Sequence, residues 1–256
     1  MYIVCCRLSS LGVSALLPLI HVSIMGCSED RDRQSFEETE LRSNITALGF
    51  HRHNSEALDL CFRKYSQGEF ISPGQLAFIL RQLRLPGAQS GHSAVAQFYE
   101  SLQTDQGYKR RHLIVASVLL GNADLNIKAN LLFEAFDDDA SRQLELSEFE
   151  TMWEVLETLA LKHLPAMLQV PSKAVQAYLD RLPNGTQTAR AEIKAELFRG
   201  AESIDMVGFR SMVGLVKLRP LVDLSEFRVL LARFYVEIKE KRPIHLGKAR
   251  KANRAI

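Results

Sequence analysis

The 256-residue chain carries 32 Lys and Arg against 30 Asp and Glu, a formal net charge of +2, and 46% of its residues are hydrophobic. A charge this close to neutral argues against a general nucleic-acid binder, and the apolar content can bury a sizeable core in one large domain or two small ones. All four cysteines lie in the first quarter of the chain, so no disulfide framework holds the main body, and a cytoplasmic protein is expected.

Residues 1–27 form an apolar segment in which no charge stands between Arg7 and Glu29. One interpretation is a signal peptide or signal anchor, which would send the chain into the secretory route. A second is a translation start at Met25, which would make Gly26 and Cys27 candidates for lipidation and allow membrane association. A third is a tail without a function. Residues 28–53 that follow are predicted to be a polar linker.

Within residues 54–121 one pattern occurs twice: an amphipathic helix, a short loop with one extended apolar residue, and a second amphipathic helix. The extended residues are Ile71 and Tyr108, and in both units the exiting stripe begins five positions later. Ser72 and Pro73 suit the cap and first turn of one exiting helix. In the first unit the entering stripe is Leu58, Cys61, Phe62 and Tyr65, and the exiting stripe is Leu76, Ile79, Leu80 and Leu83. In the second unit the entering stripe is Val95, Phe98, Tyr99 and Leu102, and the exiting stripe is Leu113, Ala116 and Leu120.

The third unit contains the most specific motif, the twelve residues Asp137–Glu148. Oxygen-bearing side chains stand at loop positions 1, 3, 5, 9 and 12, and a main-chain carbonyl at position 7 completes the ligand spacing of an EF-hand calcium loop. Position 6 is Arg142 instead of the usual glycine, which costs roughly 1 kcal/mol, so weakened binding is expected. The predicted ligands of one Ca²⁺ are Asp137, Asp139, Ser141, Gln143, Glu145 and Glu148, the last one bidentate.

Residues 122–238 hold this third unit and a fourth. Leu144, at loop position 8, is expected to pair as a short strand with a neighbouring loop, and Ile204 is its counterpart in the fourth unit. A long connection lies between the two units, with a helix-like stretch over Lys173 to Leu182. Asp223 to Ile238 predicts a final amphipathic helix, and residues 239–256 form a basic tail, either solvated or in contact with an acidic partner or membrane surface.

The ligand chemistry is not repeated in the other three units. Their loops are two residues shorter, and at the place of Glu148 they carry Gln75, His112 and Gly208, none of which is a bidentate carboxylate. Asp105 and Asp205 are isolated acids that suit solvated or capping positions. One competent calcium loop and three structural loops are therefore expected.

From about Asn54 to Ile238 the chain resembles the four-EF-hand calcium sensors, especially the calcineurin B and recoverin-like branch. The motif-specific part is Asp137 to Phe149. The resemblance implies an all-α protein of two EF-hand pairs, one loop intact and three degenerate, with an extra C-terminal helix. It also implies an exposed apolar groove that binds a partner helix, for which the candidate residues are Phe136, Phe149, Met152, Trp153 and Met212.

The leading expectation is a non-enzymatic, calcium-binding regulator that binds an amphipathic helix of a partner protein. The alternative is a calcium-independent scaffold or adaptor subunit, which the three degenerate loops favour. No enzyme and no catalytic residue are expected, because the sequence has no phosphate-binding glycine loop, HExxH or GxSxG element.

Overall fold

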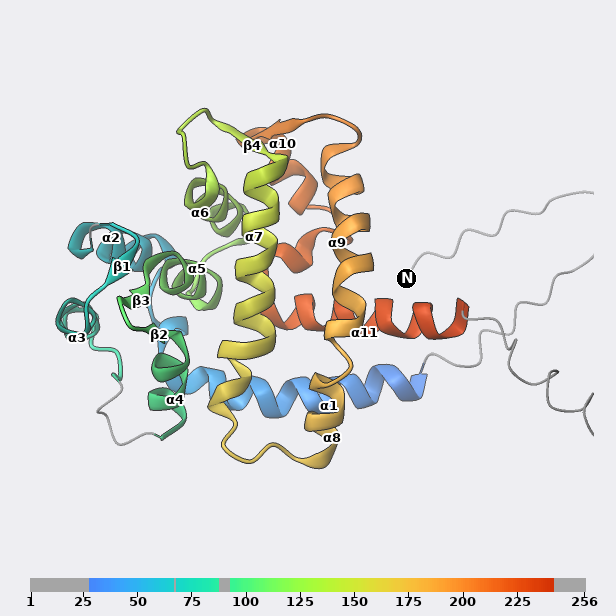
Figure 1. The fold of residues 1–256 in the computed structure, drawn as a ribbon, viewed down its shortest axis with the longest axis horizontal. Helices are drawn as coiled ribbons and strands as arrows, with labels where there is room; N and C mark the ends of the chain where they lie inside the picture. The colour runs from blue at the N-terminus through green and yellow to red at the C-terminus, as the bar shows by residue number, and fades with distance from the viewer. Residues whose placement is uncertain (1–27, 67, 88–92, 242–256) are drawn as a thin grey trace, which may run out of the picture.

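The computed structural model describes residues 28–66, 68–87 and 93–241 (Figure 1). Over these residues the chain folds into eleven α-helices with a few short strands, so the expectation of a mainly helical protein is confirmed. None of the helices in the described part is long and apolar enough to cross a lipid bilayer. The apolar segment 1–27, with Gly26 and Cys27, and the basic tail beyond residue 241 lie outside the described residues.

The first two units are joined by a small sheet. Strand β1 pairs antiparallel with β3, and Ile71 lies opposite Tyr108, the two residues predicted to be extended. The Ser72 hydroxyl accepts a hydrogen bond from the Gln75 N–H, and the Gln75 side chain accepts one from the Ser72 N–H, so the predicted cap is present. The elements are α2 (Ser55–Tyr65), β1 (Phe70–Ile71), α3 (Pro73–Gln82), α4 (Ser93–Leu102), β2 (Gln103–Thr104), β3 (Gly107–Lys109) and α5 (Arg110–Leu120).

The third and fourth units are joined in the same manner, since β4 pairs antiparallel with β5 and Leu144 lies opposite Ile204. A π-helical turn, Leu159–His163, and a 3₁₀ turn, Pro165–Met167, lead out of α7. The elements are α6 (Leu125–Phe136), β4 (Gln143–Glu145), α7 (Leu146–Thr158), α8 (Lys173–Leu179), α9 (Pro183–Phe198), β5 (Ser203–Asp205), α10 (Met206–Val213) and α11 (Leu224–Lys241).

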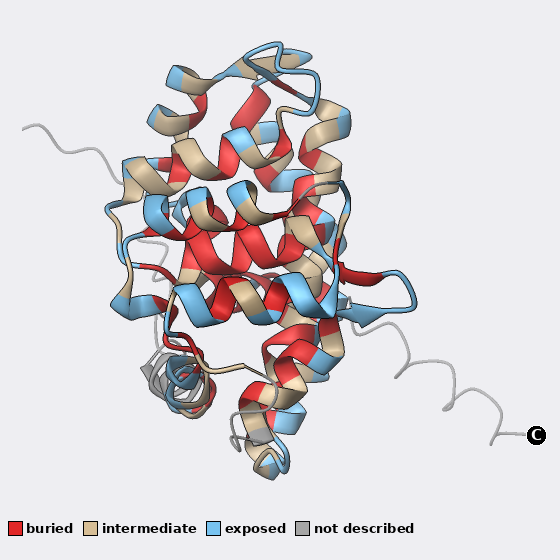
Figure 2. Ribbon diagram, turned by 90° about the vertical axis from the view of Figure 1, so that its left-hand side faces the viewer, coloured by how far each residue is buried: buried red, intermediate tan, exposed pale blue. Residues whose placement is uncertain are grey.

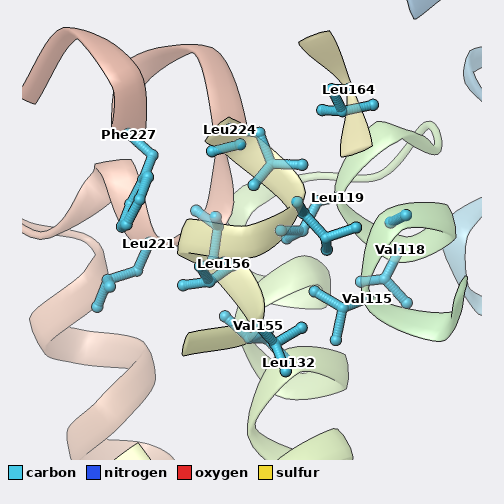
Figure 3. Close-up of a cluster of buried hydrophobic side chains, with 14 of the residues drawn as sticks. Val115, Val118, Leu119, Leu132, Val155, Leu156, Leu164, Leu221, Leu224 and Phe227 are labelled. Atoms are coloured by element: carbon cyan, nitrogen blue, oxygen red, sulfur yellow. The ribbon is translucent and has the colours of Figure 1, made fainter. Parts of the chain in front are cut away.

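One apolar core runs through both halves of the molecule (Figures 2 and 3). Helix α5 is buried from His112 to Leu119, and its aliphatic side chains meet those of α6, α7 and α11. Helix α9 lies against α11 so closely that a Cβ on Gly185 would come within 2.2 Å of the Leu231 carbonyl oxygen. A glycine is therefore required at that crossing.

Residues 28–53 are not a linker, and this prediction is wrong. They form helix α1 (Ser28–Ile45) and two 3₁₀ turns, and Leu41, Leu48 and Phe50 are buried in the core. Helix α1 contacts α8 and α11, and Figure 1 shows α1 and α11 running side by side. Its sequence lacks the apolar periodicity of the other helices, because charged side chains provide much of its attachment.

That attachment centres on Glu38. Its carboxylate accepts two hydrogen bonds of 2.7 Å from the Arg228 guanidinium of α11 and one of 2.9 Å from the Tyr178 hydroxyl of α8. Arg228 is fully buried and Glu38 is 4% exposed. Glu40 accepts hydrogen bonds from the backbone N–H and the hydroxyl of Ser172, which caps α8. Helix α1 is thus bound to two later helices by buried polar contacts.

Candidate metal centre

The loop between α6 and α7 is fixed to the core at three points. Phe136, before the loop, Phe149, after it, and Leu144 within it are all fully buried. Most of the residues between these three points are exposed. The backbone is thereby held in place by apolar packing, and the polar side chains of the loop are free to converge on one another.

Three carboxylates converge inside the loop: Asp137, Asp139 and Glu148 each place an oxygen within 4.8 Å of the others. Glu148 is oriented by two backbone donors, with Oε1 2.8 Å from the Asp138 nitrogen and Oε2 2.9 Å from the Glu145 nitrogen. Both of its oxygens are held on the loop side of α7. Glu148 also takes part in the capping box at the start of α7.

Ser141 and Gln143 complete the cluster with neutral oxygens. The Ser141 hydroxyl oxygen lies 3.4 Å from Asp137 Oδ1 and 3.1 Å from the Gln143 carbonyl oxygen. Hydrogen bonds from the hydroxyl and backbone N–H of Ser141 lower the pKa of Asp139, which favours its charged form. Glu145, the remaining predicted ligand, is exposed and does not belong to the converging group of acids.

The donor set fits a hard divalent cation. It contains only oxygens, three of them from carboxylates that repel one another and would be stabilised by a positive ion. Asp137, Asp139, Ser141, Gln143 and Glu148 would hold the ion, and its bound charge would supply the attraction that draws the loop together. The arrangement supplies oxygen donors and negative charge for binding a cation.

The loop turns through two left-handed residues, Ala140 with φ 56° and Arg142 with φ 61°. Arg142 is the position-6 residue that replaces the usual glycine, and Ala140, at position 4, is a second left-handed residue that the ligand spacing does not predict. Neither residue is glycine, so each costs roughly 1 kcal/mol. The Arg142 N–H donates a 3.1 Å hydrogen bond to Asp137 Oδ2, which holds the turn against this strain.

A cation from the neighbouring unit reaches this loop. Arg111, on α5, forms a salt bridge with Asp138, and its guanidinium carbon lies 5.2 Å from the centre of the Phe136 ring. The acids at loop positions 1 and 3 are predicted ligands, whereas Asp138, at position 2, is not. The two residues are 27 positions apart, so no local periodicity in the sequence indicates the contact.

The residues that replace Glu148 in the short loops have other roles. The Gln75 side chain closes a helix cap, and His112 is buried in α5. Gly208 donates its N–H to the Asp205 side chain at 2.7 Å, so Asp205 is a helix cap, one of the two roles predicted for it. Within the described residues, Asp137, Asp139 and Glu148 form the one group of three or more acidic, His or Cys side chains close enough to share a metal.

The predicted groove is not exposed. Phe136, Phe149, Met152 and Trp153 are fully buried, and Met212 is half-buried. Helix α11 contributes to covering them: the Trp153 ring lies 4.9 Å from the ring of Phe227. In this conformation these side chains are core residues, because the amphipathic α11 buries its own apolar face against them.

Comparisons of the chain with protein-family models, with curated proteins and with solved structures found no match. The functional assignment is therefore argued from the loop, its flanking helices and their packing.

Proposed function

We propose that the chain is a calcium-binding EF-hand protein that regulates a partner protein without catalysing a reaction. The observation that carries the proposal is the convergence of Asp137, Asp139 and Glu148, with the Ser141 hydroxyl beside them, in loop positions 1, 3, 12 and 5. The backbone pairing of Ile71 with Tyr108 and of Leu144 with Ile204 supports two EF-hand pairs, with one intact loop and three degenerate ones.

Ion binding at this loop would act directly on the two helices that flank it. Asp137 is the C-cap residue of α6, and Glu148 lies in the first turn of α7. An ion held by both residues would therefore change the orientation of these two helices relative to each other. Phe136 and Phe149 belong to the core on either side, and Trp153 follows one turn later. A reorientation of these helices predicts a calcium-dependent change in Trp153 fluorescence.

A calcium-independent adaptor is the second candidate, favoured by the burial of the predicted groove residues in this conformation. The surface that supports it is a groove of about 800 Å³ between α1, α11 and the segment after α10. Val216, 87% exposed, and Val229 give it apolar side chains, while Arg42, Lys217 and Arg233 give it cations. An amphipathic helix with an acidic face is the partner that matches this surface.

Calcium titration of the full chain by calorimetry, in the presence of magnesium, tests the proposal. We expect one site in the micromolar range, the range of EF-hand sensors, that Glu148→Gln abolishes. Glu134→Gln, an exposed acid of α6 outside the converging group, is the matched control and should bind as the wild type does. No binding by the wild-type chain would favour the adaptor, and equal loss in both variants would show that only the overall charge matters.

A further inference from the structure

A cation from another unit of the fold contacts the calcium loop on both sides of its first predicted ligand. Arg111, in the first turn of α5, forms a salt bridge with Asp138, which follows Asp137 in the chain. Its guanidinium carbon lies 5.2 Å from the centre of the ring of Phe136, which precedes Asp137. The positive charge of Arg111 is therefore held beside the predicted ligand at loop position 1.

The backbone that carries Arg111 is fixed to the rest of the molecule. The N–H of Arg110 donates a 2.9 Å hydrogen bond to the carbonyl oxygen of Glu69, and α5 is buried from His112 to Leu119. Helix α5 also contacts α6 and α7, the two helices that flank the calcium loop. The position of the Arg111 charge relative to the loop is therefore set by the packing of α5 and not by the loop alone.

Arg111 would have two opposite effects on calcium binding, of which ordering of the loop is the weaker. Phe136, Leu144 and Phe149 are fully buried, so apolar packing already fixes the loop without Arg111. The side chains of Arg111 and Asp138 are 34% and 55% exposed, and ion pairs this accessible contribute little to stability. Loss of the pair would therefore leave the loop close to its present conformation.

Repulsion of the ion is the stronger effect. Asp138 lies between two predicted ligands, and neighbouring Cα atoms are about 3.8 Å apart, so its guanidinium partner lies on the order of 10 Å from the ligand carboxylates. In water, a unit charge and a divalent charge at about that separation repel by an energy that corresponds to about a fourfold change in a dissociation constant. The Debye length is about 30 Å at about 0.01 M ionic strength and about 3 Å at about 1 M, so this repulsion acts in dilute buffer and is screened in concentrated salt.

We propose that Arg111 sets the calcium affinity of the loop, because α5 holds its positive charge close to the bound ion. The inference rests on the proposed function, since it concerns the same site. Asp138 attracts the ion and Arg111 offsets that attraction, so the pair regulates the site without providing a ligand. A movement of α5 that takes Arg111 away from the loop would raise the calcium affinity, and calcium binding would favour that movement by the same factor.

Calorimetric calcium titration of the full chain, with Arg111→Gln beside the wild type, tests the proposal at these two ionic strengths. We expect Arg111→Gln to bind calcium about fourfold more tightly than the wild type at about 0.01 M, and equally at about 1 M. Arg111→Lys keeps the charge and should bind as the wild type does. Arg233→Gln is the matched control: Arg233 forms an exposed ion pair with Glu237 of its own helix, α11, and its loss should leave the calcium affinity unchanged.

Asp138→Asn separates an effect of charge from an effect of loop order. Removing this acid should weaken calcium binding at about 0.01 M ionic strength, the opposite of Arg111→Gln, and the double variant Arg111→Gln, Asp138→Asn should lie between the two. If the pair acted by ordering the loop, both single variants would bind calcium more weakly. Thermal unfolding in chelator checks the fold, and each variant should melt close to the wild type because the pair is exposed.

Two results would overturn this role of Arg111 while leaving the calcium site in place. One is weaker or equal calcium binding by Arg111→Gln in dilute buffer, which with a lowered melting temperature would assign Arg111 to ordering the loop. The other is a tightening that persists unchanged at about 1 M ionic strength, where the charge is screened. No calcium binding by the wild type or any variant would instead contradict the proposed function, and with it this role.

Discussion

Arg142 holds the sharpest turn of the calcium loop with a backbone conformation that favours glycine. Its side chain is exposed, and its role in the turn comes from the main chain, through the hydrogen bond to Asp137. The substitution Arg142→Gly should therefore relieve strain without removing a packing contact. The experiment belongs in chelator, where calcium binding cannot contribute to the measured stability.

Arg142→Ala is the matched variant, since it removes the same charge and keeps the strained backbone. We expect Arg142→Gly to have a free energy of unfolding about 1 kcal/mol higher than Arg142→Ala, measured by urea denaturation. Equal stabilities would mean that the turn relaxes to another conformation when the arginine is removed.

At the scale of elements, α1 depends on one buried ion pair. Arg228 is surrounded by protein and is paired with both oxygens of Glu38. Removing the Glu38 charge leaves a buried guanidinium with an uncompensated charge, which typically costs 3–5 kcal/mol. Glu38→Gln should lower the free energy of unfolding by about that amount, and α1 should become accessible to proteases.

The neighbouring residue supplies the control. Glu37 is also buried, but its Oε2 atom has no hydrogen-bond partner among the described residues. Glu37→Gln makes the same chemical change and removes a charge that forms no ion pair with a described residue, so stability should stay the same or rise. If both variants lost stability equally, the pairing with Arg228 would not be what holds α1.

The contrast between α1 and the other helices shows what the sequence could predict. Apolar residues at helical spacing, a fixed offset from Ile71 or Leu144, and a cap at Ser72 are local signals, and the structure has the corresponding helices, strands and cap. The contacts of α1 join Glu38 to a residue 190 positions away, and those of Arg111 join two different units. Charged pairs at such separations leave no periodicity, so a polar helix was interpreted as a linker.

The same contrast between local signals and long-range contacts applies to the candidate site. Of the ligands predicted from the spacing, Asp137, Asp139 and Glu148 converge, whereas Glu145 does not, and the short loop with its ends fixed by apolar neighbours accounts for the convergence. Burial of the groove residues could not be predicted, because α11 returns from more than 70 positions later to cover Trp153. A helical stripe reports that one face is apolar, and the partner that covers it is set by the tertiary fold.

At the scale of the whole molecule, a pair of histidines joins the two halves. His112 belongs to α5 and His163 to the π-helical turn after α7, and their rings pack edge to face with centres 5.7 Å apart. His163 Nδ1 lies 2.9 Å from the Ser101 hydroxyl. Burial first, and nearby charged groups second, lower the pKa of each histidine from 6.5 to about 4.

This pair should make the folded state sensitive to acid. Between pH 4 and 6.5 the unfolded chain binds protons at these imidazoles that the folded chain does not, so stability is complete above pH 6.5 and falls as the pH drops towards 4. The difference corresponds to about 3 kcal/mol for each imidazole.

Urea denaturation at a series of pH values should show this loss in the wild type and a smaller loss in the double variant His112→Gln, His163→Gln. His51→Gln, which changes an exposed histidine, should keep the wild-type profile, and a double variant that lost stability as steeply as the wild type would assign the acid sensitivity to other groups.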